Sequence, residues 1–174
     1  LQHVVLLSDL KPRLTIFARA ITGEAIEIYE AEREGGYKNN NFFLPTKFYD
    51  FPSVEENLSY YLFRILYLSI QKNLDLNWKD NLEHDTIESQ QKAQETSQKV
   101  LEQLLEQFPI AETYYNKFVL HYENKAASKL PTDYSFIYGK WMKNSPDDDS
   151  ENQLKNFTEK VKTADQEKPK TIIK

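Results

Sequence analysis

The sequence predicts a mainly α-helical domain with one small β-hairpin packed on a central buried helix. Composition is the first reason. The 174 residues include only four glycines but 11 Tyr and 10 Phe, and this favours helices with aromatic packing over a loop-rich β-sandwich. The second reason is that most apolar residues recur with the helical period. The third is a short alternating stretch near residue 28, which indicates paired strands.

The first helix is predicted from about residue 10 to residue 21. Its apolar residues fall on one face: Leu10, Leu14, Phe17 and Ile21. Ser8 and Asp9 are candidate caps, and Pro12 is tolerable in a first helical turn. Gly23 ends the helix, because glycine readily adopts the left-handed conformation that follows a helix.

The alternating stretch follows directly. In the segment AIEIYEA, Ile26 and Ile28 stand on one side and polar residues on the other, as in a half-buried strand. Gly35-Gly36 supplies a turn, and residues 42–44 form the return strand, which the following proline ends. We therefore predict a β-hairpin over about residues 24–48. Two strands alone are marginal in water, so the hairpin is expected to lie against helices.

The central helix has the strongest local signals. Ser53 and Glu56 form a capping box, in which the hydroxyl accepts one free backbone N–H and the glutamate reaches back to another. Pro52 keeps the residue before it out of helical geometry. The helix runs to about Lys72, and its apolar residues cover well over half of the circumference: Leu58, Tyr61, Leu62, Phe63, Ile65, Leu66, Leu68 and Ile70. A helix that is apolar over so much of its surface is expected to be enclosed by protein.

Two longer helices and a short aromatic segment follow. Asp85 and Glu88 indicate a cap for a helix over about residues 86–107, which is expected to dock only through its apolar second half. Another helix is predicted over about residues 110–127, with Ile110, Tyr114, Phe118 and Tyr122 at four-residue intervals. Residues 134–142 favour a helix, but their alternating aromatics leave a strand open.

The domain is predicted to end near residue 142. Residues 143–174 contain few apolar residues and a balanced mix of charges, so we expect a solvated linker or tail. Leu154, Phe157 and Val161 could form one weak amphipathic helix.

Composition also argues against several functions. The net charge of −5 offers no basic field for nucleic acid or an anionic membrane. There is no cysteine, which excludes disulfides and thiolate chemistry and fits a reducing compartment. The longest apolar run, residues 58–70, is interrupted by Arg64 and is too short to span a bilayer. No signal-peptide pattern is present, so we expect a cytoplasmic protein without membrane insertion.

No catalytic, cofactor or metal motif is recognised. His3, His84 and His121 are scattered and lack the spacing of a zinc site. The run Glu83-His84-Asp85 is interpreted as a solvated loop and cap, because adjacent residues point in different directions. The acidic run at residues 147–149 lacks the spacing of a calcium loop. We therefore expect no enzyme, no cofactor and no metal.

The best local candidate for a site is a polar stripe on the central helix. Asn57, Arg64 and Gln71 stand seven residues apart, flanked by Tyr60 and Tyr67. A buried arginine needs a partner, because an uncompensated charge inside protein is costly. One hypothesis is a structural ion pair between Arg64 and a carboxylate of Glu27, Glu30, Glu32 or Asp50. The other is a partner-facing groove lined by Tyr60, Arg64 and Tyr67, residue types that dominate binding hot spots.

One stretch resembles a known family. FFLPTKFYDFPSVEENLSYYLFRILYLS, residues 42–69, and the upstream RLTIFARAITG, residues 13–23, are similar to the N-terminal region of NorD-type nitric oxide reductase activation proteins and their relatives that act on Rubisco. The similar residues are Phe43-Leu44-Pro45, Phe48, Phe51-Pro52, Asn57, Tyr60-Tyr61 and Arg64. The resemblance covers about residues 8–72.

The resemblance implies an adaptor that works with a MoxR-type AAA+ ATPase to activate or mature a metalloenzyme such as nitric oxide reductase. In that family a von Willebrand factor A domain follows, with a metal site that needs the pattern D-x-S-x-S. The nearest match here, residues 148–152, lacks the second serine, so we expect this chain to be the N-terminal piece and residues from 143 onward to begin the linker.

Two other functions stay open. A small-molecule-binding helical domain would show an enclosed apolar cavity of a few hundred Å³ with converging tyrosine hydroxyls. An enzyme would gather Asp and Glu side chains in one cleft with raised pKa values.

Overall fold

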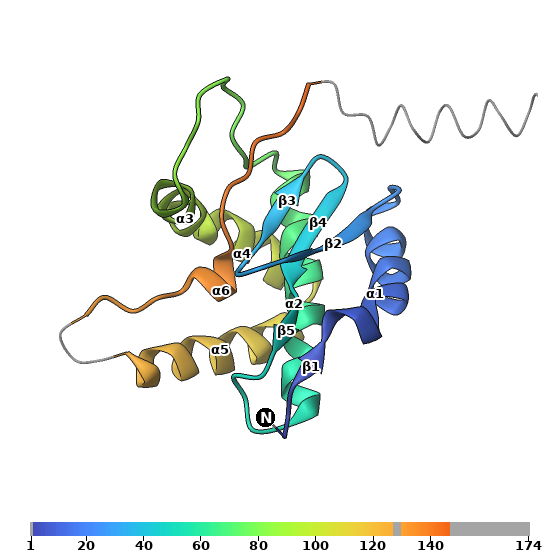
Figure 1. The fold of residues 1–174 in the computed structure, drawn as a ribbon, viewed down its shortest axis with the longest axis vertical. Helices are drawn as coiled ribbons and strands as arrows, with labels where there is room; N and C mark the ends of the chain where they lie inside the picture. The colour runs from blue at the N-terminus through green and yellow to red at the C-terminus, as the bar shows by residue number, and fades with distance from the viewer. Residues whose placement is uncertain (1, 127–129, 147–174) are drawn as a thin grey trace, which may run out of the picture.

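A computed structural model describes residues 2–126 and 130–146 of the chain (Figure 1). Helices dominate the described residues, and short strands accompany them, so the fold is mixed α/β with mostly helix. The helices are α1 (Leu7–Thr22), α2 (Val54–Asn73), α3 (Thr86–Glu95), α4 (Ser97–Gln107), α5 (Ala111–Lys125) and α6 (Ser135–Tyr138). The strands are β1 (Val5–Leu6), β2 (Glu27–Ala31), β3 (Gly36–Lys38), β4 (Asn41–Pro45) and β5 (Lys47–Phe48).

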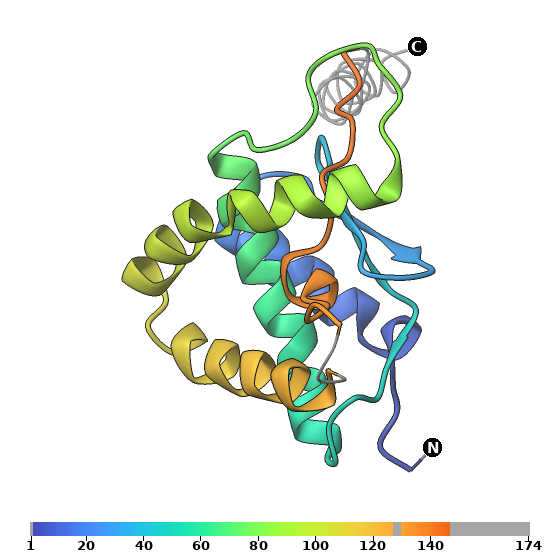
Figure 2. The ribbon, with the colours of Figure 1, turned by 90° about the vertical axis from the view of Figure 1, so that its left-hand side faces the viewer.

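The central helix α2 is enclosed, as predicted. From Tyr60 to Gln71 every residue except Leu62 is buried. Helix α1 lies along one side of α2 and α5 on the other (Figures 1 and 2), and α4 and the strand β4 also contact it. Among the described residues, no helix combines the length and the apolar character needed to cross a membrane.

The N-terminus of α2 is capped by Ser53, as predicted. The Ser53 hydroxyl accepts the backbone N–H of Glu56 at 3.1 Å. The Glu56 carboxylate does not reach back to a backbone N–H but accepts from the same hydroxyl at 3.0 Å. The capping box therefore closes through the two side chains, and the helix begins where the sequence indicated.

The predicted β-hairpin exists, but between other strands than expected. The two predicted segments contain the strands β2 and β4, which lie side by side, but β2 and β4 are parallel. The antiparallel partner of β4 is β3, so the order is β2-β4-β3. The hairpin turn is at Asn39, with φ 52°, and Gly36 belongs to β3. The prediction of a Gly35-Gly36 turn was wrong because β3 is too short to show any alternation.

Helix α1 begins earlier than predicted. β1 pairs antiparallel with β5, and the N–H of Leu7 donates to the carbonyl of Thr46 at 2.9 Å. This pairing sets the helix start at Leu7, and no side chain caps it, so Ser8 and Asp9 lie inside the first turn. Gly23 ends α1 in the left-handed conformation, with φ 69°, as predicted.

The predicted helix over residues 86–107 is two helices. Asp85 caps α3 as expected, accepting the N–H of Glu88 at 2.7 Å. The helix breaks at Thr96, whose hydroxyl donates to the carbonyl of Lys92 at 2.8 Å, a local bond that bends helices. The polar first half also docks, through Ser89 and Ala93, which are both buried.

The segment after α5 crosses back over the domain. Residues 135–138 form the short helix α6, and the following residues are extended, with a parallel bridge between Trp78 and Lys143. Lys143 to Ser145 therefore contact the domain. Ile110, predicted on the apolar face of α5, is 59 % exposed. The predicted linker and weak helix beyond residue 146 lie outside the described residues.

Candidate functional site

All five predicted site residues lie inside the domain. Asn57, Tyr60 and Arg64 are 0 % exposed, Tyr67 is 1 % and Gln71 is 2 % exposed. Asn57, Arg64 and Gln71, which stand seven residues apart, are all covered by other parts of the domain. These side chains, however, line no open groove at the surface of the described residues. We call these five residues the α2 stripe.

Asn57 holds the start of α2 to two other segments. Its side-chain oxygen accepts the N–H of Phe51 at 2.9 Å. Its amide nitrogen donates to the carbonyls of Phe51 at 3.1 Å and His3 at 2.6 Å. The segment around Phe51, which leads into α2, is therefore fixed by a buried amide whose oxygen and nitrogen are both hydrogen-bonded.

Arg64 has a main-chain partner and not the predicted carboxylate. Its Nη1 donates to the carbonyl of Ile137 at 2.7 Å, while Nε and Nη2 make no hydrogen bond within the described residues. Of the four carboxylates proposed for it, none forms an ion pair with it there. Glu27 pairs instead with Arg19, and Asp50 accepts from Tyr122. The structural ion pair was a wrong prediction.

The electrostatics of Arg64 follow from its burial. Desolvation lowers the pKa of Arg64 below its usual value, and Tyr60, Tyr67 and the buried Glu34 act in the opposite direction. The guanidinium carbon lies 5.2 Å from the centre of the Tyr67 ring, which is within the range of a cation–π contact. The aromatic face and the carbonyl thus stabilise the buried cation without a contacting carboxylate.

Two of the remaining residues of the α2 stripe also bind main-chain oxygens, whereas the Tyr67 hydroxyl has no hydrogen-bond partner within the described residues. Tyr60 donates to the carbonyl of Phe136 at 2.8 Å, and Gln71 donates to the carbonyl of Leu76 at 3.0 Å. Burial raises the pKa of both Tyr60 and Tyr67. The α2 stripe therefore binds main-chain oxygens of the N-terminal, α2–α3 and α6 segments, and its evident role is to hold these segments on α2.

An open cleft lies at the C-terminal end of α5, where no site residue was predicted. Its volume is about 560 Å³. The walls come from the β2–β3 connection, from the β5–α2 connection, from α5 and from α6 with the segment that leads into it: Arg33, Tyr49, Asp50, Tyr122, Lys125, Ala126, Leu130, Pro131, Asp133 and Phe136. We call it the α5 cleft.

The α5 cleft combines aromatic rings with charged groups. Tyr122 donates to the Asp50 carboxylate at 2.8 Å, and burial raises the pKa of Tyr122. The Arg33 guanidinium lies 5.7 Å from the centre of the Phe136 ring and 3.9 Å from Asp133. Leu130 is 69 % and Tyr49 is 43 % exposed, so apolar groups stand at the surface here.

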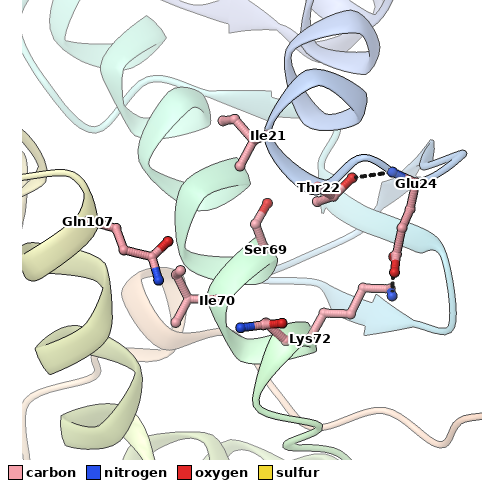
Figure 3. A pocket seen from close by; sticks show the side chains of 8 residues that line it. Ile21, Thr22, Glu24, Ser69, Ile70, Lys72 and Gln107 are labelled. Atoms are coloured by element: carbon pink, nitrogen blue, oxygen red, sulfur yellow. Dashed lines mark hydrogen bonds and ion pairs between the residues drawn. The ribbon is translucent and has the colours of Figure 1, made fainter.

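A smaller hollow of about 190 Å³ lies where the C-terminal residues of three helices meet (Figure 3). Thr22, Asn73 and Gln107, the last residues of α1, α2 and α4, all line it. The ammonium group of Lys72 forms an ion pair with Glu24 at its edge. Helix C-termini carry partial negative charge and favour a nearby cation. The ammonium group of Lys72 supplies that positive charge here.

Neither hollow gathers the side chains of a metal centre. No group of three or more His, Cys, Asp and Glu suited to a metal ion occurs within residues 2–126 and 130–146.

Comparisons with protein-family models, with curated proteins and with solved structures find no match.

Proposed function

We propose that this chain is a protein-interaction domain of an adaptor that works with a MoxR-type AAA+ ATPase to activate or mature a metalloenzyme. The resemblance of residues 8–72 supplies the kind of partner. The α5 cleft supplies a surface, and it is the single observation that supports the proposal most strongly.

The composition of the α5 cleft supports a protein partner. Tyr49 and Arg33 are residue types enriched at binding hot spots, because they give a large contact area together with directed hydrogen bonds. Phe136 adds an aromatic ring, a group enriched at protein interfaces. Leu130 adds an exposed apolar side chain at the rim. The opposite charges of Arg33 and Asp133 would fix the orientation of a partner whose surface carries both a negative and a positive group.

The α2 stripe supports the proposal differently. Asn57, Tyr60 and Arg64 carry much of the resemblance, and all three are buried and bind main-chain groups. In this proposal these three residues stabilise the scaffold, and residues on the surface of the domain determine which partner binds. An Arg64→Ala variant would disturb the scaffold itself, so it cannot test partner contact.

The test is capture of a purified MoxR-type AAA+ ATPase by the immobilised chain. Tyr49→Ala is expected to weaken capture about tenfold, the loss of roughly 1.4 kcal/mol. Tyr29→Ala is the matched control, because Tyr29 is 45 % and Tyr49 is 43 % exposed and Tyr29 lies on β2, away from the α5 cleft. Absent capture by the unsubstituted chain, or equal losses in both variants, would contradict the proposal.

A second candidate is binding of a small molecule, which the volume of the α5 cleft favours. About 560 Å³ falls within the range of ligand pockets. The Tyr122 hydroxyl and the Asp50 carboxylate would fix a polar group there. Native mass spectrometry of the purified chain tests this: a bound small molecule that Tyr122→Phe releases would favour it over the adaptor.

A further inference from the structure

A histidine in the connection between α2 and α3 is stacked on a tryptophan. The rings of His84 and Trp78 are 3.6 Å apart and inclined by 5°. Trp78 is fixed from other sides, since its Nε1 donates to Ser89 at 3.0 Å and the Trp141 ring meets it edge-on at 5.1 Å. The His84 side chain is only 10 % exposed.

Both nitrogens of the imidazole face carboxylates. Nε2 of His84 lies 2.7 Å from Oδ1 of Asp80, and Nδ1 lies 3.3 Å from Oε2 of Glu88. Ionised carboxylates only accept hydrogen bonds, and only the protonated imidazolium carries two N–H donors. A neutral ring would turn one lone pair toward a carboxylate. The arrangement therefore fits the cation, which also gains from stacking on Trp78.

Other charged groups surround this cluster. Glu83, Lys140 and Lys143 line the hollow beside it, and the Lys92 ammonium lies 6.0 Å from the Trp78 ring centre. The hydrogen bond to Asp80 raises the pKa of His84 above its usual value, and Glu88 adds to this against some desolvation. The same contact with His84 lowers the pKa of Asp80.

Trp78 also holds the last described segment of the chain. Its N–H donates to the carbonyl of Met142 at 2.9 Å, and its carbonyl accepts the N–H of Asn144 at 3.4 Å. The N–H of Trp141 donates to the carbonyl of Ser89 at 3.0 Å. Residues 141–144 are therefore attached to the domain partly through Trp78, on which His84 stacks. Asn77 Oδ1, which accepts the N–H of Met142, and Thr96, which accepts from Nε1 of Trp141 at 3.3 Å, hold the same segment from other positions.

We propose that His84 is a proton-operated clamp, which fixes Trp78 and residues 141–144 to the domain when protonated and loosens them when neutral. This regulation is separate from any partner bound at the α5 cleft.

The direction of the pH effect follows from the shifted pKa. A pKa raised in the folded state means that the stabilisation is fully present below the unfolded value of about 6.5 and is lost as pH rises through the folded value. The clamp is thus closed in mild acid and opens on the alkaline side of pH 6.5.

Tryptophan fluorescence reads the protonation directly, because the chain has only two tryptophans and both belong to this cluster. A protonated ring stacked on Trp78 quenches it, so emission is expected to rise with a midpoint above about 6.5. His84→Gln removes this transition, and His3→Gln, at an exposed position, keeps it. Asp80→Asn shifts the midpoint to lower pH. A midpoint at or below the ordinary value would overturn the proposal.

Hydrogen exchange tests the clamp itself. After correction for intrinsic rates, the amides of Trp78 and Asn144, which bond Trp78 to this segment, are expected to exchange about tenfold faster above the midpoint than below it. In His84→Gln they exchange fast at every pH. Equal protection on both sides of the midpoint, in a chain whose fluorescence still titrates, would overturn the proposal.

Discussion

Asn57 holds Phe51 at both of its main-chain groups, accepting from its N–H at 2.9 Å and donating to its carbonyl at 3.1 Å. A side-chain amide can do this because it carries an acceptor and a donor on one planar group. The residue that precedes Pro52 is thereby fixed from inside the helix that it leads into. The same amide reaches the carbonyl of His3, so the two chain segments are ordered together.

Replacing Asn57 is expected to be strongly destabilising. Asn57→Asp keeps the size but turns carboxylate oxygens toward the carbonyls of His3 and Phe51, so the unfolding free energy should fall by about 2–4 kcal/mol. Asn73→Asp, at the exposed end of the same helix, is the control and should stay within about 1 kcal/mol. Chemical denaturation measures both, and equal losses would contradict the role assigned to Asn57.

The cap of α2 gives a second prediction. Ser53→Ala removes the acceptor for the N–H of Glu56 and should cost about 1 kcal/mol. Ser59→Ala is matched to it, because the Ser59 hydroxyl only donates to the carbonyl of Glu55 within the same helix. That variant should be neutral within about 0.5 kcal/mol. Thermal unfolding of the two proteins separates them, and an equal shift would show that the cap contributes nothing.

Substitutions at Gly35 and Gly23 can be compared directly, because both glycines have φ near +69°. A Cβ at Gly23 would meet nothing within 4 Å, so Gly23→Ala should cost only the left-handed strain of about 1–2 kcal/mol. A Cβ at Gly35 would collide with the carbonyl of Phe43 in β4. Gly35→Ala should therefore cost at least about 2 kcal/mol more, and similar unfolding free energies would refute the close approach.

Alkaline pH should unfold the protein through its buried tyrosines. Burial raises the pKa of Tyr60, Tyr61 and Tyr67, whereas tyrosine in an unfolded chain ionises near 10. Their contribution to stability is complete below about pH 10. Above it the unfolded state loses protons that the folded state keeps, so stability falls by up to about 1.4 kcal/mol per pH unit for each. The phenolate absorbance of these buried tyrosines should appear together with loss of circular dichroism, and their ionisation in a folded chain would contradict the prediction.

Local signals in the sequence predicted the helical part of the fold well. The cap at Ser53, the burial of α2 and the end of α1 at Gly23 each depend on neighbouring residues or a regular period, which one sequence contains. The break at Thr96 was missed because one threonine in a polar stretch leaves the period unchanged. Its hydroxyl bond to Lys92 is what bends the chain there.

Strand pairing was harder, because it joins segments that are distant in sequence. The three asparagines at positions 39–41 held a usable signal, since Asn tolerates positive φ, and Asn39 does form the turn. Nothing local could show that β2 would add to the other edge of β4 in parallel.

In the candidate site, too, local features were predictable from the sequence and contacts between distant segments were not. The spacing of Asn57, Arg64 and Gln71 predicted a shared face and the burial of Arg64, but not that its partner would be the carbonyl of Ile137, 73 residues away. The α5 cleft is assembled from Arg33 and three distant segments. A surface of this kind has no period or motif, so sequence reasoning could not find it.

Asn57, Arg64 and Gln71 all grasp peptide oxygens and not side chains. Every amino acid presents the same main-chain oxygen. The sequences of the segments that these side chains bind can therefore change during evolution while the hydrogen bonds are kept. Descendants of this chain could thus look unrelated along their loops and termini, and three positions of one helix would be the durable trace of shared ancestry.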